Sequence, residues 1–187
     1  MPAPSTAPPA GNRQVIKTKR GYPLEVTLFP IEIGTELGDP GYTRIRYELK
    51  IIVKNQLTDR PTPAWGYGVD FYYDLSAVPF SAGPGATLGR GRDCHNPYVK
   101  IDGRKYCGLG ASLSMGSGGP DEPIAAGAEL DGGVPSNAFV TCVVDDANLD
   151  AARTYLQRPS YWRFRLAPAG SGGAYGLESF RFPYTSP

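Results

Sequence analysis

Hydrophobic residues occupy every second position over residues 43–55, in the run TRIRYELKIIVKN. The apolar positions are Ile45, Tyr47, Leu49, Ile51 and Val53. Most positions between and after them are charged: Arg44, Arg46, Glu48, Lys50 and Lys54. Strict period-two alternation is typical of a β-strand with one face in a core and one in water, whereas helical spacing would leave these residues no apolar stripe. The chain is therefore expected to be built on an antiparallel sheet.

Shorter segments show the same strand pattern elsewhere in the chain. Strands are predicted over 22–33, 66–75, 137–144, 161–166 and 175–183. Pro23 and Pro30 cannot donate a hydrogen bond to a ladder, so the first of these is expected to lie at an edge or to break at Pro30. Asp102-Gly103, between two strand-like arms, predicts a tight hairpin.

These elements predict an all-β fold. Gly 24 and Pro 19 without a G-X-Y period indicate many turns between short strands. About seven strands and one helix, predicted over 147–156 with Asp145 or Asp146 as its cap, favour an antiparallel β-sandwich, because a half-buried sheet needs a second sheet to cover it. Residues 1–21 are interpreted as a flexible Pro/Ala-rich arm, and 22–187 as a single domain.

The order of several segments resembles a known family. The segments are VTLFPIEI, IRYELKIIVKN, GYGVDFYYD, AAGAELDGGVPSNAFVTCVVDD and YWRFRL. They resemble the immunoglobulin-like extracytoplasmic domains of actinobacterial and other Gram-positive lipoproteins and secreted antigens, in which a long strand ends in V-x-N before a loop. The resemblance covers roughly residues 22–183 and implies an immunoglobulin-like sandwich that binds a partner without catalysis. It assigns no functional residues, and the segment 80–120 departs from the family pattern.

Charge and hydropathy limit the partners that the chain can be expected to have. A formal net charge of +1 provides no global field to attract nucleic acid or an anionic membrane. No apolar run is long enough for a transmembrane segment. The first residues, MPAPSTAPPAGN, lack the charged and apolar regions of a signal peptide. Since Pro/Ala-rich tethers are common in exported proteins, an extracytoplasmic location is favoured over use without export.

The three cysteines suggest one disulfide. Cys94 and Cys107 flank the predicted hairpin, and a bridge between them would close a loop of about a dozen residues. Folding at Asp102-Gly103 places Cys107 near Tyr98, so the bridge requires the chain before Tyr98 to bend inward. Cys142 is expected to be a buried core thiol. Three cysteines permit three single pairings, and spacing alone does not choose among them.

Residues for catalysis are scarce, and no enzyme activity, metal or cofactor is predicted. His95 is the only histidine, so a His-rich metal site is excluded and a catalytic triad would have to use this residue. A loop histidine is the simpler interpretation. Asp146, Asn148 and Asp150 match the first positions of a calcium loop, but the glycine and the final glutamate are missing. Helix capping explains these side chains more simply.

Two groups of residues are candidates for binding. Trp65, Tyr67 and Tyr72 lie near a Pro-rich loop and could form an exposed aromatic patch, although aromatic residues in this strand more often belong to a core. Arg90 and Arg92, in a glycine-rich loop without a P-loop motif, could contact an anion.

The sequence thus favours a non-enzymatic, extracytoplasmic binding module that recognises a macromolecular partner through loops such as 61–67 and 80–96. The second kind of partner that the sequence allows is another copy of the same chain, through self-assembly, and no nucleic-acid partner is expected. The alternative is a virion structural protein of a high-GC phage, such as a capsid decoration, minor capsid or tail component, with terminal arms like FRFPYTSP that become ordered only on a neighbour. A hydrolase that uses His95 is the third hypothesis.

Overall fold

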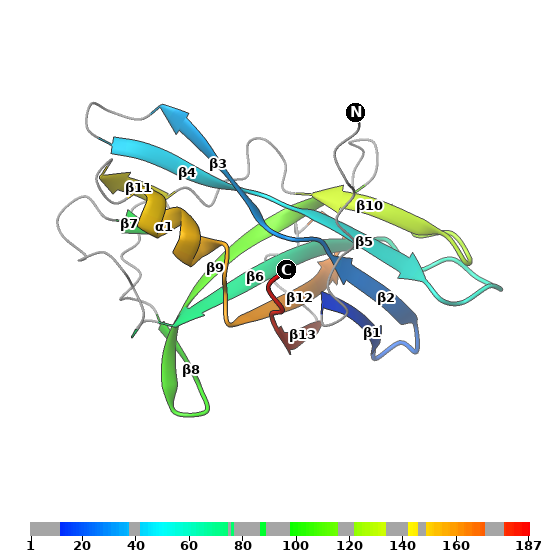
Figure 1. Ribbon diagram of the computed structural model, residues 1–187. Coiled ribbons are helices and arrows are strands. Elements are labelled where there is room, and N and C mark those ends of the chain that lie inside the picture. Colours follow the sequence, from blue (N-terminus) through cyan, green and yellow to red (C-terminus); the bar gives the residue numbers. More distant parts are fainter. Residues whose placement is uncertain are drawn as a thin grey trace.

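The computed structural model describes residues 12–37, 42–74, 76, 87–88, 98–115, 122–133, 142–145, 149–170 and 178–187. Within these ranges the larger sheet contains β1 (Arg13–Lys17), β2 (Pro23–Leu28), β5 (Lys50–Asn55), β6 (Trp65–Asp74), β8 (Tyr98–Ile101), β9 (Arg104–Met115), β10 (Glu129–Gly133), β12 (Tyr161–Pro168) and β13 (Glu178–Pro183). The smaller sheet contains β3 (Glu32–Leu37), β4 (Tyr42–Glu48), β7 (Thr87–Leu88) and β11 (Cys142–Asp145). The helix α1 spans Leu149–Leu156 (Figure 1).

The described residues therefore confirm a mostly β protein with antiparallel sheets and a helix. They contain more strands than the roughly seven expected. Two of the long hydrophobic runs are each divided between two strands. The strand β9 extends through the glycine-containing segment GLGASLSM, which was not among the predicted strands.

Two neighbouring strands cross together from one sheet to the other. The alternating run 43–55 is interrupted at Leu49, so that β4 belongs to the smaller sheet and β5 to the larger one. The run 23–37 divides in the same way between β2 and β3, as expected from Pro30. The amide of Phe29 donates to the carbonyl of Lys50 at 3.0 Å, and this hydrogen bond joins the bend after β2 to the bend before β5.

The larger sheet curls until its outer strands meet. Its path runs β1-β2-β5-β10-β9-β6-β12-β13, with β8 attached to β9. Asn12 and Thr185 exchange two hydrogen bonds beyond one end of these outer strands, of 2.8 and 3.0 Å. At the other end, the amide of Lys19 donates to Glu178 Oε1 at 2.6 Å. The strands β1 and β13 therefore run in opposite directions along a seam that is tied at both ends. No backbone ladder joins the two strands in the described residues, so the sheet curves around the core as an open barrel (Figure 1).

The strand β1 corrects the expected boundary of the N-terminal arm. Residues 13–17 pair with β2, and the side chain of Ile16 is buried in the core. A tight turn makes this possible, because Gly21 adopts a φ of +84° and its amide donates to the carbonyl of Thr18. The folded domain thus begins by Asn12 rather than at residue 22, and β2 is not an edge strand.

The core fills the barrel interior with aromatic and aliphatic side chains. The largest fully buried ones are Trp162, Tyr67, Tyr73, Phe71, Phe164, Leu24, Leu28, Ile51, Ile124 and Leu156. Trp162 packs against Phe182 with ring centroids 5.1 Å apart, and Tyr67 stacks on Phe164 at 5.5 Å. Alternate residues of β6 and β12 therefore face the core.

Two further sequence predictions are confirmed. Asp102 and Gly103 both have positive φ, +48° and +80°, and join β8 to β9 in a tight hairpin that places Cys107 opposite Tyr98. The helix α1 begins at Leu149, two residues after its expected start. Its residues Ala152 and Leu156 are buried, and Tyr73 Oη donates to the carbonyl of Leu156 at 2.7 Å, which fixes the helix to β6.

Candidate functional site

The three aromatic candidates are buried, so the expectation of an exposed aromatic patch is wrong. Trp65, Tyr67 and Tyr72 are 3%, 1% and 4% exposed. Trp65 meets the ring of Tyr22 edge-on, and Tyr67 belongs to the barrel core. Tyr72 lies on the outer face of β6, but Ile101 and Tyr106 from the β8–β9 hairpin cover it. These contacts explain the burial, because both faces of β6 are packed against other elements.

Several other predicted sites lie outside the described residues. These include Arg90, Arg92, Cys94 and His95, and all of the loop 80–96 except residues 87–88. Cys107 lies on β9 opposite Tyr73 and Tyr98, but its bridge to Cys94 stays a prediction. The C-terminal segment FRFPYTSP was expected to become ordered only on a neighbour. Its first residues instead belong to β13, which pairs with β12 of the same chain.

The best organised exposed feature is a pair of loops at one end of the barrel, residues 56–64 and 122–128, which we call the loop pair. The fully buried side chain of Asn55 lies at its base. Asn55 Nδ2 lies 2.9 Å from the carbonyl oxygen of Arg60 and 3.3 Å from those of Ile124 and Ala125. Asn55 Oδ1 accepts a hydrogen bond from the amide of Leu57 at 3.0 Å. One side chain therefore joins both loops to the end of β5.

Further hydrogen bonds connect the two loops directly. The amide of Thr62 donates to the carbonyl of Ile124 at 2.9 Å, and the amide of Ile124 donates to Thr62 Oγ1 at 2.8 Å. The amide of Gly127 donates to the carbonyl of Leu57 at 2.6 Å. Since Thr62 and Ile124 are themselves buried, water does not compete for the two bonds between them.

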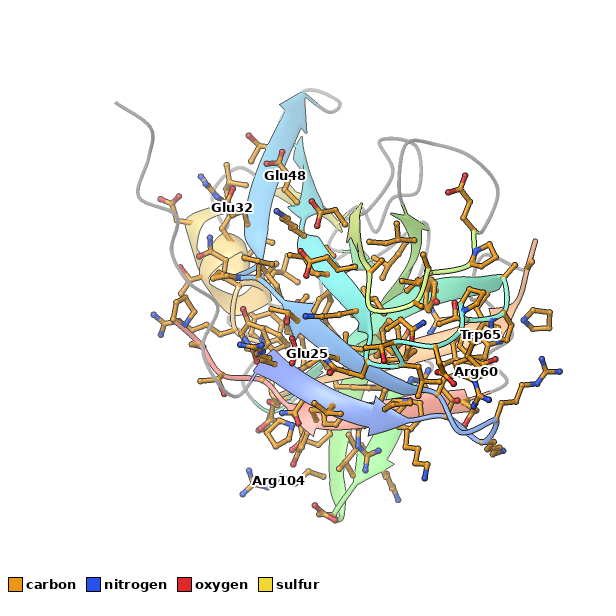
Figure 2. The ribbon with its side chains drawn as sticks, turned by 90° about the vertical axis from the view of Figure 1, so that its right-hand side faces the viewer. Glu25, Glu32, Glu48, Arg60, Trp65 and Arg104 are labelled. Atoms are coloured by element: carbon orange, nitrogen blue, oxygen red, sulfur yellow. The ribbon has the colours of Figure 1, made fainter. Side chains whose placement is uncertain are left out.

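The outer surface of the loop pair is open to solvent. Its exposed residues are Gln56, Thr58, Asp59, Arg60, Pro61, Glu122, Pro123, Ala125, Ala126 and Gly127. The guanidinium of Arg60 lies over the ring of Tyr22 at 5.3 Å, and Tyr22 packs edge-on against Trp65 at 5.5 Å. Figure 2 shows Arg60 and Trp65 on the same side of the molecule. The loop pair thus has a base fixed by hydrogen bonds. Its exposed residues, which we call the rim, include both positively and negatively charged side chains.

A second polar region lies on the outer face of β6 and β12. Asp70 and Arg165 are each 8% exposed there. Asp70 Oδ2 lies 2.8 Å from Arg165 Nε and accepts a 2.7 Å hydrogen bond from Arg163 Nε. A Cβ atom on Gly68 would stand only 2.6 Å from Arg165 Nη2, so the glycine allows this guanidinium to lie flat on the sheet. Sequence reasoning missed the cluster, although alternation places Asp70 opposite the core face of its strand.

A third region surrounds Asp74 at the end of β6. One cavity of about 650 Å³ is lined by Asp74, Asp150, Ala151, Thr154, Tyr155, Arg158 and Ser160. A second cavity, of about 570 Å³, is lined by Asp74, Ser76, Arg104 and Lys105. Asp74 Oδ1 accepts hydrogen bonds from Ser76 Oγ at 2.7 Å and from the Ser76 amide at 2.9 Å, and these bonds lower the pKa of the carboxyl. The carboxylate is therefore ionised at neutral pH.

The described residues contain neither an assembled metal site nor a membrane-spanning helix. In these ranges, no three His, Cys, Asp or Glu side chains lie close enough together to hold a metal ion. The helix in the described part of the chain is too short and too polar to cross a bilayer. Comparisons with protein-family models, curated proteins and solved structures find no match to this chain.

Proposed function

We propose that this protein is a non-enzymatic, extracytoplasmic binding module that recognises a macromolecular partner through the loop pair. The observation that carries the proposal is the anchoring of both loops by the buried side chain of Asn55. Loops held on a rigid scaffold are the usual location of recognition residues in β proteins. Ordering before binding also reduces the conformational entropy lost on association.

The rim of the loop pair fits a protein surface. It carries one cation, Arg60, and two carboxylates, Asp59 and Glu122. Pro61 and Pro123 add conformational rigidity. Such a mixture offers directional contacts without the basic track that a polyanion requires. The predicted loop 61–67 overlaps this surface, although its aromatic residues Trp65 and Tyr67 are buried supports rather than contacts.

The extracytoplasmic location rests on the sequence. The Pro/Ala-rich residues before β1 suit a tether, and the resemblance to envelope domains favours the same compartment. Protease digestion of intact source cells tests this part of the proposal. We expect the protein to be degraded while a cytoplasmic marker survives, and protection of both would contradict it.

Photo-crosslinking tests the loop pair as the contact surface. A photoreactive amino acid is introduced at Pro61 in one variant and, as a control, at Lys100 on the exposed β8–β9 hairpin in another. Irradiation in the source cells should give a discrete adduct from position 61 only, and its yield should fall when Arg60→Ala and Asp59→Ala are added. Equal adducts from both positions, or no effect of the two substitutions, would remove the loop pair from the proposal.

A further inference from the structure

Beyond the loop pair, the outer face of β6, β12 and β13 concentrates positive charge. Cross-strand register places Arg163 opposite Asp70 on one side and opposite Arg181 on the other. Arg165 lies two positions further along β12, on the same face of the strand. Three guanidinium groups thus accompany the single carboxylate of Asp70, and we call these four residues the arginine face.

Asp70 is already engaged by two of the arginines. Its Oδ2 atom lies 2.6 Å from Arg163 Nη2 and 2.8 Å from Arg165 Nε. Arg165 is held against the sheet over Gly68, and its side chain is only 10% exposed. Arg163 is 35% exposed, so its guanidinium is oriented by Asp70 but still reaches solvent. The carboxylate therefore fixes the geometry of the face without balancing its charge.

Arg163 and Arg181 are like charges placed directly opposite each other on neighbouring strands. Such a pair is normally destabilising. Each guanidinium instead lies over a tyrosine ring of the adjacent strand: Arg163 over Tyr72 at 5.7 Å and Arg181 over Tyr161 at 5.8 Å. The two rings are themselves opposite each other in the β6–β12 register. These cation–π contacts hold two cations side by side at the surface.

The environment of Tyr72 supports this description of the face. Burial raises the pKa of its phenol, and the charge of Arg163 partly opposes that increase. The charge of Asp70 raises the pKa further, and Arg181 and Arg165 also lie close enough to lower it. All three guanidinium groups therefore affect the pKa of the Tyr72 hydroxyl, as expected if their charges lie close together on the outer face of β6.

We propose that the arginine face, through Arg163 and Arg181, binds carboxylate groups of an acidic protein segment. A guanidinium presents paired N–H donors that match the two oxygens of a carboxylate. A protein segment fits better than a nucleic acid, because the two exposed guanidinium groups of Arg163 and Arg181 can pair with individual carboxylates, whereas a polyphosphate needs a longer series of cations.

The test measures binding of a fluorescein-labelled peptide of about eight glutamates by fluorescence anisotropy at about 50 mM salt. Arg181→Ala is the main variant, because Arg181 is exposed and lies outside the ion pairs of Asp70. Arg20→Ala is the matched control, since Arg20 is also an exposed arginine but lies in the turn between β1 and β2, outside both the arginine face and the loop pair. Arg181→Ala should weaken binding about threefold to tenfold and Arg181→Glu should abolish it, while Arg20→Ala leaves the affinity unchanged.

Urea unfolding of each variant shows that the fold is retained. Binding that is lost equally in Arg20→Ala and Arg181→Ala would overturn the proposal, as would no saturable binding of the peptide to the unmodified protein. An oligothymidylate of the same charge that binds more tightly through Arg181 would also overturn it, in favour of nucleic acid. Because Arg181 lies outside the loop pair, its substitution leaves that surface intact, and the two proposals can fail independently.

Discussion

Asn12 and Thr185 form a reciprocal pair across 173 positions of sequence: Asn12 Nδ2 donates to the carbonyl of Thr185, and the Thr185 amide donates to Asn12 Oδ1. The side chain of Asn12 is fully buried, so both of its polar groups are satisfied by this single partner. The pair fastens one end of the seam between β1 and β13. Barrel closure therefore depends on a residue that composition assigns to a flexible arm.

We expect Asn12→Ala to lower the free energy of unfolding by about 1–2 kcal/mol, because two hydrogen bonds at a buried site are lost. Asn12→Asp should also destabilise the protein, since a carboxylate accepts from the Thr185 amide but cannot donate to its carbonyl. Equilibrium unfolding in urea measures both variants. Gln56→Ala, which truncates an exposed carboxamide, is the control and should stay within about 0.5 kcal/mol of the unmodified protein. An equal effect of Asn12→Ala and Gln56→Ala would show that the seam contributes nothing.

Asn55→Ala should cost more, about 2–4 kcal/mol, because it removes the hydrogen bonds that one fully buried side chain makes to both loops and leaves a cavity in its place. Hydrogen exchange should show faster exchange at the amide of Leu57, which donates to Asn55 Oδ1. Thr62→Val keeps the size of the side chain and removes the acceptor for the Ile124 amide and the donor to the Pro63 carbonyl, so a smaller loss of about 1–2 kcal/mol is expected. If Asn55→Ala leaves exchange in both loops unchanged, the loops are ordered by other contacts.

Gly68→Ala should destabilise the protein by about 1–3 kcal/mol, because its methyl group would displace the guanidinium of Arg165. A double-mutant cycle tests the cause. In an Arg165→Ala background, Gly68→Ala should cost less than half as much, since the obstructing group is absent. Gly108→Ala is the comparison, because its Cβ would meet only the ring of Tyr72 at 3.2 Å and requires a smaller shift. Additive costs in the cycle would contradict the proposed displacement.

The carboxyl of Asp74 should make stability depend on pH in the acid range. Hydrogen bonds from Ser76 lower its pKa in the folded state, so below the ordinary value of about 3.9 the unfolded state takes up the proton first. The stabilisation is therefore complete above that pH and is lost as the pH falls through the folded pKa. Asp74→Asn should remove this part of the acid dependence, and Ser76→Ala should remove some of it. Unfolding midpoints measured from pH 6 down to about pH 2 test both, and parallel profiles for all three proteins would refute the assignment.

Local patterns predicted much of the fold. Alternation identified β5, β6 and β12, because the side-chain period of a strand is a property of the strand itself. Asp102-Gly103 identified the β8–β9 hairpin, since few residues accept two successive positive φ angles. The bend at Leu49 was not predicted, because the alternation continues through it and only the pairing partners change.

The candidate sites were harder to predict, since they depend on which strands become neighbours. Alternation correctly separated Tyr72 from the core face of β6, but it could not show that the β8–β9 hairpin covers the other face. The contact of Asp70 with Arg165 likewise requires the β6–β12 register, which joins segments about ninety positions apart. The strand β1 could have been predicted from the sequence, because Val15 and Ile16 are adjacent hydrophobic residues within a largely polar segment.

The seam between β1 and β13 also constrains how the protein folds during synthesis. The first strand leaves the ribosome long before Thr185, which supplies its closing partner. Until then β1 is supported only by β2, on one of its two edges. An open strand edge is a site for pairing with other chains. The nascent chain is therefore more exposed to misassembly until residues 178–185 have emerged, and the seam forms late in folding relative to β1.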